Sequence, residues 1–311
     1  MNWFFVNLKR FDVPRQLGGV CPFDHPKEWI HWVMAESIEA GIGRQGDTTV
    51  TFLLPEALII HAIEKLETYP HELRGNIHIG NQGVFREDVT PGKNFGAFTT
   101  NLPASAAKNM GCTWAIIGHS EEVRDKMGIV ESFCGTFQDK GNDRGKARKA
   151  VSGLINEEIR CALGAGLNVL FCVGEDASER GEGSFEAQKP RIEAVLREQL
   201  EEGLRAVSPL LGDRRIVIGY EPVWAIGPGK TPPDAEYIGF VSSFIKETIR
   251  ELYPFEPIVI YGGGLKEENA GMISRVNTID GGLIALTRFT GEIGFSPLEL
   301  KGIIDTYLAG S

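Results

Sequence analysis

Short apolar runs alternate with longer amphipathic segments along the whole chain. Short apolar or β-branched runs between turn residues are typical of buried strands, and apolar residues at spacings of three and four are typical of helices. The predicted strands are Trp3–Asn7, Thr49–Leu54, Asn76–Gly80, Thr113–Ile117, Asn168–Cys172, Ile216–Tyr220, Pro257–Tyr261 and Ile279–Ala285. The predicted helices are Pro26–Ala40, Ala57–Glu67, Pro103–Asn109, Lys146–Ala165, Phe185–Ala206, Ala235–Leu252, Glu267–Ser274 and Pro297–Leu308.

This regular alternation favours a parallel sheet, and its eightfold repetition favours closure into an α/β barrel. The pattern alone does not separate a barrel from an open, doubly wound sheet. The chain has 311 residues. That length accommodates either one barrel of about 250 residues with insertions or two ordinary domains.

The composition is that of an ordinary globular protein, with 42% hydrophobic and 24% charged residues. The formal net charge of −10 argues against nucleic acid or an anionic membrane as a partner. A phosphorylated substrate would therefore need positive potential supplied locally by its binding site.

Five scattered cysteines, without paired metal spacing, indicate free thiols in a reducing compartment. The apolar run at residues 3–6 is too short for a secretory signal, and no stretch is long enough to cross a membrane. These features predict a cytoplasmic protein. No dinucleotide fingerprint, phosphate-loop consensus or metal-ligand spacing is present in the sequence.

The most informative stretch is Gly219–Thr231, which reads Gly-Tyr-Glu-Pro-Val-Trp-Ala-Ile-Gly-Pro-Gly-Lys-Thr. Pro222 follows Glu221 and biases it away from helical geometry, so we expect the carboxylate at the tip of the preceding strand. The apolar residues and glycines that follow suggest a lid. A lone Glu in a loop is usually a solvated charge, but the complete string resembles the lid of the triosephosphate isomerase family. That resemblance implies that Glu221 is a catalytic base.

Two further motifs follow predicted strands, where a barrel of this kind carries its chemistry. Residues 7–9 (Asn-Leu-Lys) resemble the family's Asn-x-Lys, which implies that Lys9 and Asn7 stabilise charge on a substrate oxygen. Residues 117–121 match the family's Ile-Gly-His-Ser-Glu, which implies that His119 is a neutral imidazole that donates a hydrogen bond to the substrate. A zinc deaminase is excluded, because no Pro-Cys-x-x-Cys follows.

The phosphate end departs from the family, whose members bind phosphate with backbone N–H groups of three loops. Gly227 fits the first loop, whereas Gly264 stands in place of the serine that ends the second. In the third loop, Ala285 and Leu286 replace two glycines. A Cβ at such turns obstructs the close approach of a phosphate to the backbone. We expect these residues to line the substrate site and to bind phosphate more weakly than in other family members.

The lid's closure is also altered. In the family, the tyrosine and serine of the seventh loop bond to N–H groups of the closed lid. Gly264 lacks the serine hydroxyl, and Pro232 lacks an N–H to receive the bond from the tyrosine. Arg288 is predicted either to replace the lost anion donors or to be an exposed surface residue.

Two other regions bear on assembly and shape. Gly96–Thr99 resembles the family's dimer loop, although Thr100 and Asn101 stand where Gly and Glu are usual, so the resemblance implies a homodimer. Insertions are expected near residues 12–31 and 125–150. The charged run Gln138–Lys149 is predicted to be a solvated, mobile loop.

The resemblance implies one (β/α)₈ barrel domain over residues 1–311, acting without metal or organic cofactor. It implies an aldose–ketose isomerase that interconverts dihydroxyacetone phosphate and glyceraldehyde 3-phosphate through an enediol, a step of glycolysis and gluconeogenesis. Two alternatives stay open. One is an isomerase of another small ketose phosphate, such as an erythrulose phosphate. The other is a catalytically silent barrel with a binding or regulatory role.

Overall fold

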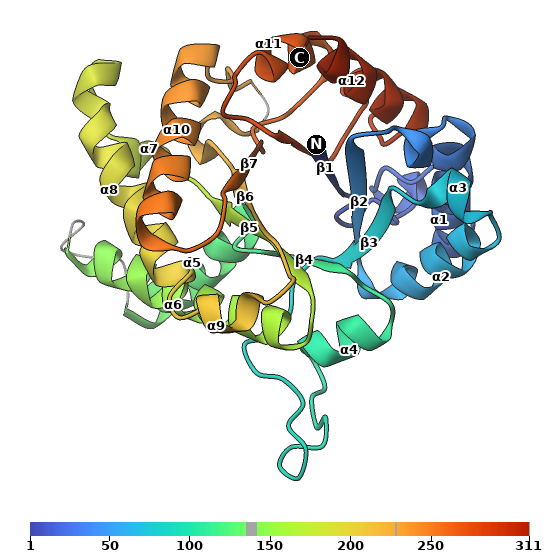
Figure 1. Ribbon diagram of the computed structural model, residues 1–311, viewed down its shortest axis with the longest axis horizontal. Helices are drawn as coiled ribbons and strands as arrows, with labels where there is room; N and C mark the ends of the chain where they lie inside the picture. The colour runs from blue at the N-terminus through green and yellow to red at the C-terminus, as the bar shows by residue number, and fades with distance from the viewer. Residues whose placement is uncertain (135–141, 228, 311) are drawn as a thin grey trace.

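The computed structural model describes residues 1–134, 142–227 and 229–310, and it shows a closed barrel of eight parallel strands (Figure 1). Each strand pairs with the next along the chain, and the first pairs with the last. The strands are β1 (Asn2–Asn7), β2 (Thr48–Leu54), β3 (Ile77–Asn81), β4 (Trp114–Ile117), β5 (Asn168–Val173), β6 (Ile216–Tyr220), β7 (Ile258–Tyr261) and β8 (Gly281–Ile284). All predicted strands are confirmed to within two residues, and the open sheet is excluded.

The helices surround the barrel, as Figure 1 shows. The α-helices are α1 (Pro26–Glu39), α2 (Glu56–Glu67), α3 (His71–Arg74), α4 (Ala104–Asn109), α5 (Ser120–Cys134), α6 (Asn142–Gly164), α7 (Ala177–Arg180), α8 (Phe185–Gly203), α9 (Ser208–Leu211), α10 (Ala235–Leu252), α11 (Glu267–Ser274) and α12 (Pro297–Gly310). Short 3₁₀ turns cover Arg15–Leu17, Ile42–Arg44 and Val223–Ala225. Most of the long helices follow the sequence pattern, whereas the one-turn helices α3, α7 and α9 carry too few residues to show a period.

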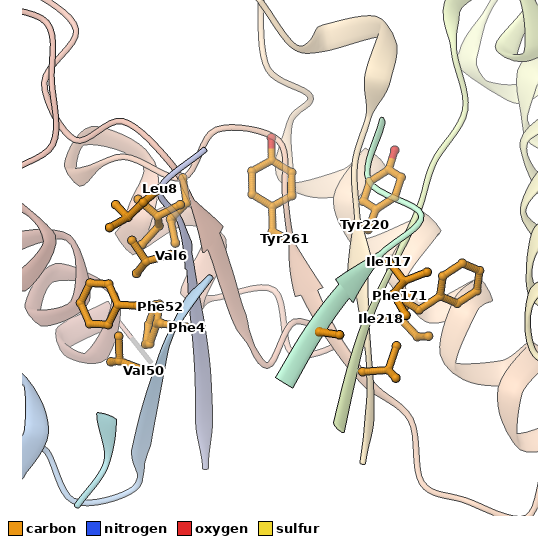
Figure 2. Packing of buried hydrophobic residues seen from close by; sticks show 14 of the residues in the cluster. Phe4, Val6, Leu8, Val50, Phe52, Ile117, Phe171, Ile218, Tyr220 and Tyr261 are labelled. Carbon is orange, nitrogen blue, oxygen red and sulfur yellow. The ribbon is translucent and has the colours of Figure 1, made fainter. Parts of the chain in front are cut away.

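Alternation along the strands divides the apolar residues between two clusters. In β1, Phe4 and Val6 belong to the larger cluster, which also holds apolar residues of the surrounding helices. Trp3 and Phe5 belong to a smaller cluster made almost entirely of strand residues, which fills the barrel interior. Figure 2 shows part of the larger cluster. The strands are therefore buried on both faces, which is why they read as continuous apolar runs.

The barrel interior is filled unevenly. The Trp114 ring packs edge-on against Phe5, with ring centroids 4.9 Å apart, and against Trp3 at 5.7 Å. Gly80 on the neighbouring strand lets the two backbones lie close together, because a Cβ there would lie 2.6 Å from the carbonyl oxygen of Trp114. The close approach of β3 to β4 at this point thus requires a glycine on β3.

The charged run Gln138–Lys149 corrects one prediction. Its described part is the start of α6 and not a mobile loop, while positions 138–141 lie outside the described residues. Arg144 forms an ion pair with Asp176, and an Arg148 guanidinium N–H donates to the carbonyl oxygen of Gly174 at 3.2 Å. Acceptors at the end of β5 therefore pair with these arginines and order the segment.

The extended loop near residues 12–31 ends where α1 begins at Pro26. Its Arg15 forms an ion pair of 3.0 Å with Glu292, in the long connection that follows β8. In the same connection, Phe295 is buried and lies edge-on to Phe52 of β2. Two segments far apart in the sequence thus meet at the carboxyl end of the barrel.

Within the described ranges, no helix is long and apolar enough to cross a membrane. Cys21, Cys112, Cys161 and Cys172 are free thiols. No group of three or more His, Cys, Asp or Glu side chains in the part of the chain that the structure describes could hold a metal ion.

Candidate active site

Glu221 lies directly after β6 and is almost completely buried, with 3% of its surface exposed. Its backbone N–H donates to the carbonyl oxygen of Val173 at 2.8 Å, which continues the pairing between β5 and β6. The carboxylate accepts hydrogen bonds from the backbone N–H of Ser120 at 3.0 Å and from its hydroxyl at 3.2 Å. Ser120 begins α5, so the carboxylate lies at the positive end of a helix.

Close packing of two loops fixes the backbone of Glu221. A Cβ on Gly174 would lie 1.7 Å from the carbonyl oxygen of Glu221, so only glycine fits at the end of β5. A Cβ on Gly262 would lie 3.1 Å from the Cγ of Glu221. The carboxylate is therefore positioned by neighbouring backbone on both sides.

His119 is between β4 and α5 and contacts Glu221 directly. Its Nδ1 accepts a hydrogen bond from the backbone N–H of Glu121 at 3.3 Å. An N–H donor facing Nδ1 requires a lone pair there, which leaves the proton of a neutral imidazole on Nε2. Nε2 lies 3.3 Å from the Oε1 atom of Glu221. The geometry thus directs the Nε2 atom of His119 at the Glu221 carboxylate, at the mouth of the barrel.

Lys9 follows β1 and has a left-handed backbone with φ of 41°. The Oδ1 atom of Asn7 accepts a hydrogen bond from the Lys9 N–H at 3.1 Å and supports this turn. The side-chain amide of Gln82 also donates to Asn7 Oδ1, and to the carbonyl oxygen of Lys9, both at 3.1 Å. Asn7 therefore acts on the backbone of Lys9 in this structure.

The ammonium of Lys9 forms an ion pair of 2.5 Å with Glu121. Burial raises the pKa of the Glu121 carboxyl, but the hydrogen bond and charge of Lys9 outweigh it and hold that pKa below its ordinary value. The backbone of Glu121 contacts His119 and its side chain contacts Lys9. The structure thus connects three predicted catalytic residues, from the ends of β1, β4 and β6, through Glu121 and Ser120.

The sequence matches the family model described as triosephosphate isomerase over residues 33–292. This chain belongs to the triosephosphate isomerase family. A triosephosphate isomerase of Geobacter metallireducens is 34% identical over 215 residues, covering 67% of this chain and 70% of that protein. The triosephosphate isomerase of Pelodictyon phaeoclathratiforme is 36% identical over 257 residues, covering 81% and 84%.

A solved structure of triosephosphate isomerase from Bartonella henselae has the same fold. It superimposes with a TM-score of 0.66 over 99% of both chains, at 22% sequence identity. The family match includes His119 and Glu221 but begins after Asn7 and Lys9. The assignment of those two residues therefore rests on their motif and on their contacts.

At the predicted phosphate end of this family member, backbone donors are open. The N–H groups of Gly227, Gly264 and Leu286 have no hydrogen-bond acceptor among the described residues. Gly227 and Gly264 are exposed, with φ of 124° and 89°, angles that favour glycine. Ala285 and Leu286 directly follow β8 and are half-buried.

Arg288 binds to α12. Its Nε and a terminal guanidinium nitrogen lie 2.8 Å and 2.7 Å from the same carboxylate oxygen of Glu299. The hydroxyl of Thr287 donates to the other oxygen of Glu299 at 2.8 Å. This pairing indicates that Arg288 stabilises the connection after β8. Of the two predictions for Arg288, it favours an exposed surface residue over an anion donor.

A pair of carboxyls, the half-buried Glu122 and the buried Glu158, supports the loop that carries His119. Glu122 accepts a hydrogen bond from the Gly118 N–H at 2.7 Å, and Lys126 bridges Glu122 to Glu158. Burial, together with the hydrogen bond and charge of Glu122, raises the pKa of Glu158 to about 9. The carboxyl of Glu158 therefore binds a proton more readily than an ordinary carboxyl does.

Sequence reasoning did not assign a role to Ser120, Gln82 or Glu121. Ser120 and Glu121 are part of the quoted motif at 117–121, so their position was visible although their contacts were not. Gln82 comes one residue after β3, and its place at a strand end was the available signal.

Proposed function

We propose that this chain is an aldose–ketose isomerase that interconverts dihydroxyacetone phosphate and glyceraldehyde 3-phosphate, within one domain formed by residues 1–311. The observation that carries the proposal is the buried Glu221 carboxylate, whose Oε1 lies 3.3 Å from His119 Nε2 at the carboxyl ends of two barrel strands. A carboxylate beside a neutral N–H donor is the pair that proton abstraction next to a carbonyl group requires.

In the proposed reaction, the Glu221 carboxylate removes a proton from the carbon next to the substrate carbonyl. The electron pair of that C–H bond moves to the carbonyl oxygen and gives an enediolate. The N–H of His119 and the ammonium of Lys9 stabilise this negative oxygen. His119 then donates its Nε2 proton to this oxygen and takes a proton from the hydroxyl on the other carbon, so the negative charge moves to the second oxygen. As that oxygen becomes the new carbonyl, the Glu221 carboxylic acid returns its proton to the carbon that carried the original carbonyl, and atoms and charges balance.

The open N–H groups of Gly227, Gly264 and Leu286 support phosphate as the group that anchors the substrate. Backbone donors in left-handed or turn conformations form anion-binding concavities, and they suit a chain whose net charge is −10. The side chain of Leu286 limits how closely a phosphate can approach these backbone N–H groups. This favours a small phosphorylated sugar that binds with modest affinity.

The test is a coupled assay on glyceraldehyde 3-phosphate and dihydroxyacetone phosphate, run beside erythrulose 4-phosphate. The proposal predicts the higher kcat/KM for the trioses and the loss of turnover in Glu221→Gln. A higher kcat/KM for the tetrose would reassign the substrate. Binding without turnover of any of them would support the silent barrel.

A homodimer is proposed on the loop between β3 and α4, which Figure 1 shows protruding from the barrel. Phe95 near its tip is 80% exposed, next to the Gly96–Thr99 segment. A groove of about 930 Å³ lies beside the base of this loop and fits a segment from a second copy. Its lining includes Arg10, Gln82, Phe85, Asn101 and Ile129. Sedimentation of the purified chain would test the assembly.

A further inference from the structure

Glu175 is fully buried, two residues after β5, and its Oε1 atom accepts three hydrogen bonds. The donors are the Tyr220 hydroxyl at 3.0 Å, the Trp224 indole N–H at 2.8 Å and the Tyr237 hydroxyl at 2.7 Å. Burial raises the pKa of this carboxyl even though all three hydrogen bonds oppose the rise. A buried carboxylate of this kind is stable only while its donors stay in place.

Two of these donors flank the proposed catalytic base. Tyr220 immediately precedes Glu221, and Trp224 lies in the 3₁₀ turn Val223–Ala225 that opens the lid. Figure 2 shows the Tyr220 ring among buried residues of the larger cluster. A group that fixes both side chains also limits the angles available to the backbone between them.

Trp224 is held on several sides. The guanidinium of Arg180 lies 3.8 Å from the centroid of the indole ring, and the Tyr237 ring meets the indole edge-on at 5.4 Å. Among the described residues, the bond from Trp224 to Glu175 is the one hydrogen bond that ties residues 222–233 to the rest of the barrel. The hydroxyl of Tyr261 donates instead to the carbonyl oxygen of Gly263 at 3.1 Å.

Tyr237 is itself firmly placed. The Asp234 carboxylate caps α10 by accepting the backbone N–H of Tyr237 at 2.9 Å. The Phe185 ring stacks on the Tyr237 ring, with centroids 4.9 Å apart. The Tyr237 hydroxyl is therefore held in position to bond to Glu175, at little further cost in side-chain entropy.

We propose that Tyr237 is a positioning residue for the lid and the base. Its hydroxyl fixes Glu175, and Glu175 holds Tyr220 and Trp224 on the two sides of Glu221. The kinetic consequence of this arrangement rests on the proposed isomerase function. The structural consequence does not, because it concerns the environment of Trp224 without substrate.

The experiment compares Tyr237→Phe with Tyr253→Phe. The first substitution keeps the ring and removes only the hydroxyl bond to Glu175. The second removes a comparable bond, from the Tyr253 hydroxyl to the carbonyl oxygen of Leu200 at 3.1 Å, at the far end of α10. Each protein is labelled with 5-fluorotryptophan, and its ¹⁹F spectrum is recorded without substrate. Trp224→Phe identifies the signal of Trp224.

We expect Tyr237→Phe to shift or broaden the Trp224 signal and to lower kcat about tenfold with KM changed less than about twofold, the size of one lost hydrogen bond to a charged acceptor. Tyr253→Phe should change neither. An unmoved Trp224 signal, or a shifted signal with unchanged kcat, would overturn the proposal. If the unsubstituted chain shows no turnover, the proposed function fails, and the Trp224 signal alone decides whether Tyr237 positions the lid.

Discussion

The two ends of the site are built differently. At the reacting end, Glu221, His119 and Lys9 are each bonded to other groups of the fold before any substrate arrives. At the phosphate end, the N–H groups of Gly227 and Gly264 have no partner within the described residues. In the proposed function, the reacting end is preorganised, whereas the phosphate end is completed when its ligand binds.

This difference has a physical cause. Groups that stabilise a transition state are most effective when no reorganisation is needed during the reaction. A binding loop that holds only the phosphate gains its hydrogen bonds when the ligand enters, so exposed N–H groups bonded to water cost little beforehand. The reacting end should therefore tolerate substitutions poorly, and the phosphate end should tolerate them better.

After substitution of the base itself, the largest effect is expected at the reacting end, from Lys9→Met. In the proposed reaction, loss of the ammonium removes a positive charge that stabilises the enediolate, so kcat/KM should fall about 10² to 10³-fold. The coupled assay measures this, with the exposed Lys27→Met as a control. A fall of less than tenfold would mean that Lys9 has no part in stabilising the enediolate.

Two glycine substitutions test whether the backbone is packed more tightly at the reacting end than at the phosphate end. Gly174→Ala places a Cβ 1.7 Å from the Glu221 carbonyl oxygen, so we expect a loss of about 3 kcal/mol or more in the free energy of unfolding. Gly264→Ala meets no atom within 4 Å, and only its φ of 89° opposes the change, at about 1 kcal/mol. Denaturant melts of both variants measure the two losses. Equal losses of unfolding free energy in the two variants would contradict a difference in packing between the two ends.

The carboxyl pair Glu122 and Glu158, which supports the His119 loop, predicts how the free energy of unfolding depends on pH. The pKa of Glu158 rises from its ordinary value of 4.5 to about 9, so between these values the folded chain binds a proton that the unfolded chain has lost. The free energy of unfolding should therefore fall as pH rises toward 9, by up to about 1 kcal/mol per pH unit. Glu158→Gln should remove this decline.

The exposed Glu157→Gln, one position earlier on α6, is the matched control and should leave the decline unchanged. A pH dependence that is the same in Glu158→Gln would show that Glu158 is ionised in the folded chain.

The smallest effect is expected at the phosphate end, from Leu286→Gly. Removing the side chain lets the phosphate approach the backbone more closely, so KM for glyceraldehyde 3-phosphate should fall about threefold, less than 1 kcal/mol of binding. Steady-state kinetics measure it, and kcat should not change. A raised KM would mean that the Leu286 side chain itself supports the bound substrate.

Much of this picture could be predicted from the sequence. The strands are buried on both faces and therefore appear as apolar runs, and the motifs around Glu221 and His119 identified the family. The partner of Arg288 could not be predicted, because Glu299 belongs to a different element and nothing in the local pattern indicates the pairing. Arg144 was expected in a mobile loop for the same reason, since its partner Asp176 follows a strand that is distant in the sequence.

The contacts of Glu175 were also beyond sequence reasoning. Its three donors come from β6, the lid and α10. Only the fold brings these elements to one carboxylate oxygen.

The central claim is that Glu221 transfers the proton at a preorganised reacting end. The most direct measurement is ¹H NMR of glyceraldehyde 3-phosphate turnover in D₂O, with the unsubstituted chain and with Glu221→Gln. We predict dihydroxyacetone phosphate that carries deuterium from the solvent with the unsubstituted chain, and neither conversion nor exchange with Glu221→Gln. Deuterium exchange at an undiminished rate in Glu221→Gln would contradict the claim, because another group would then be the base.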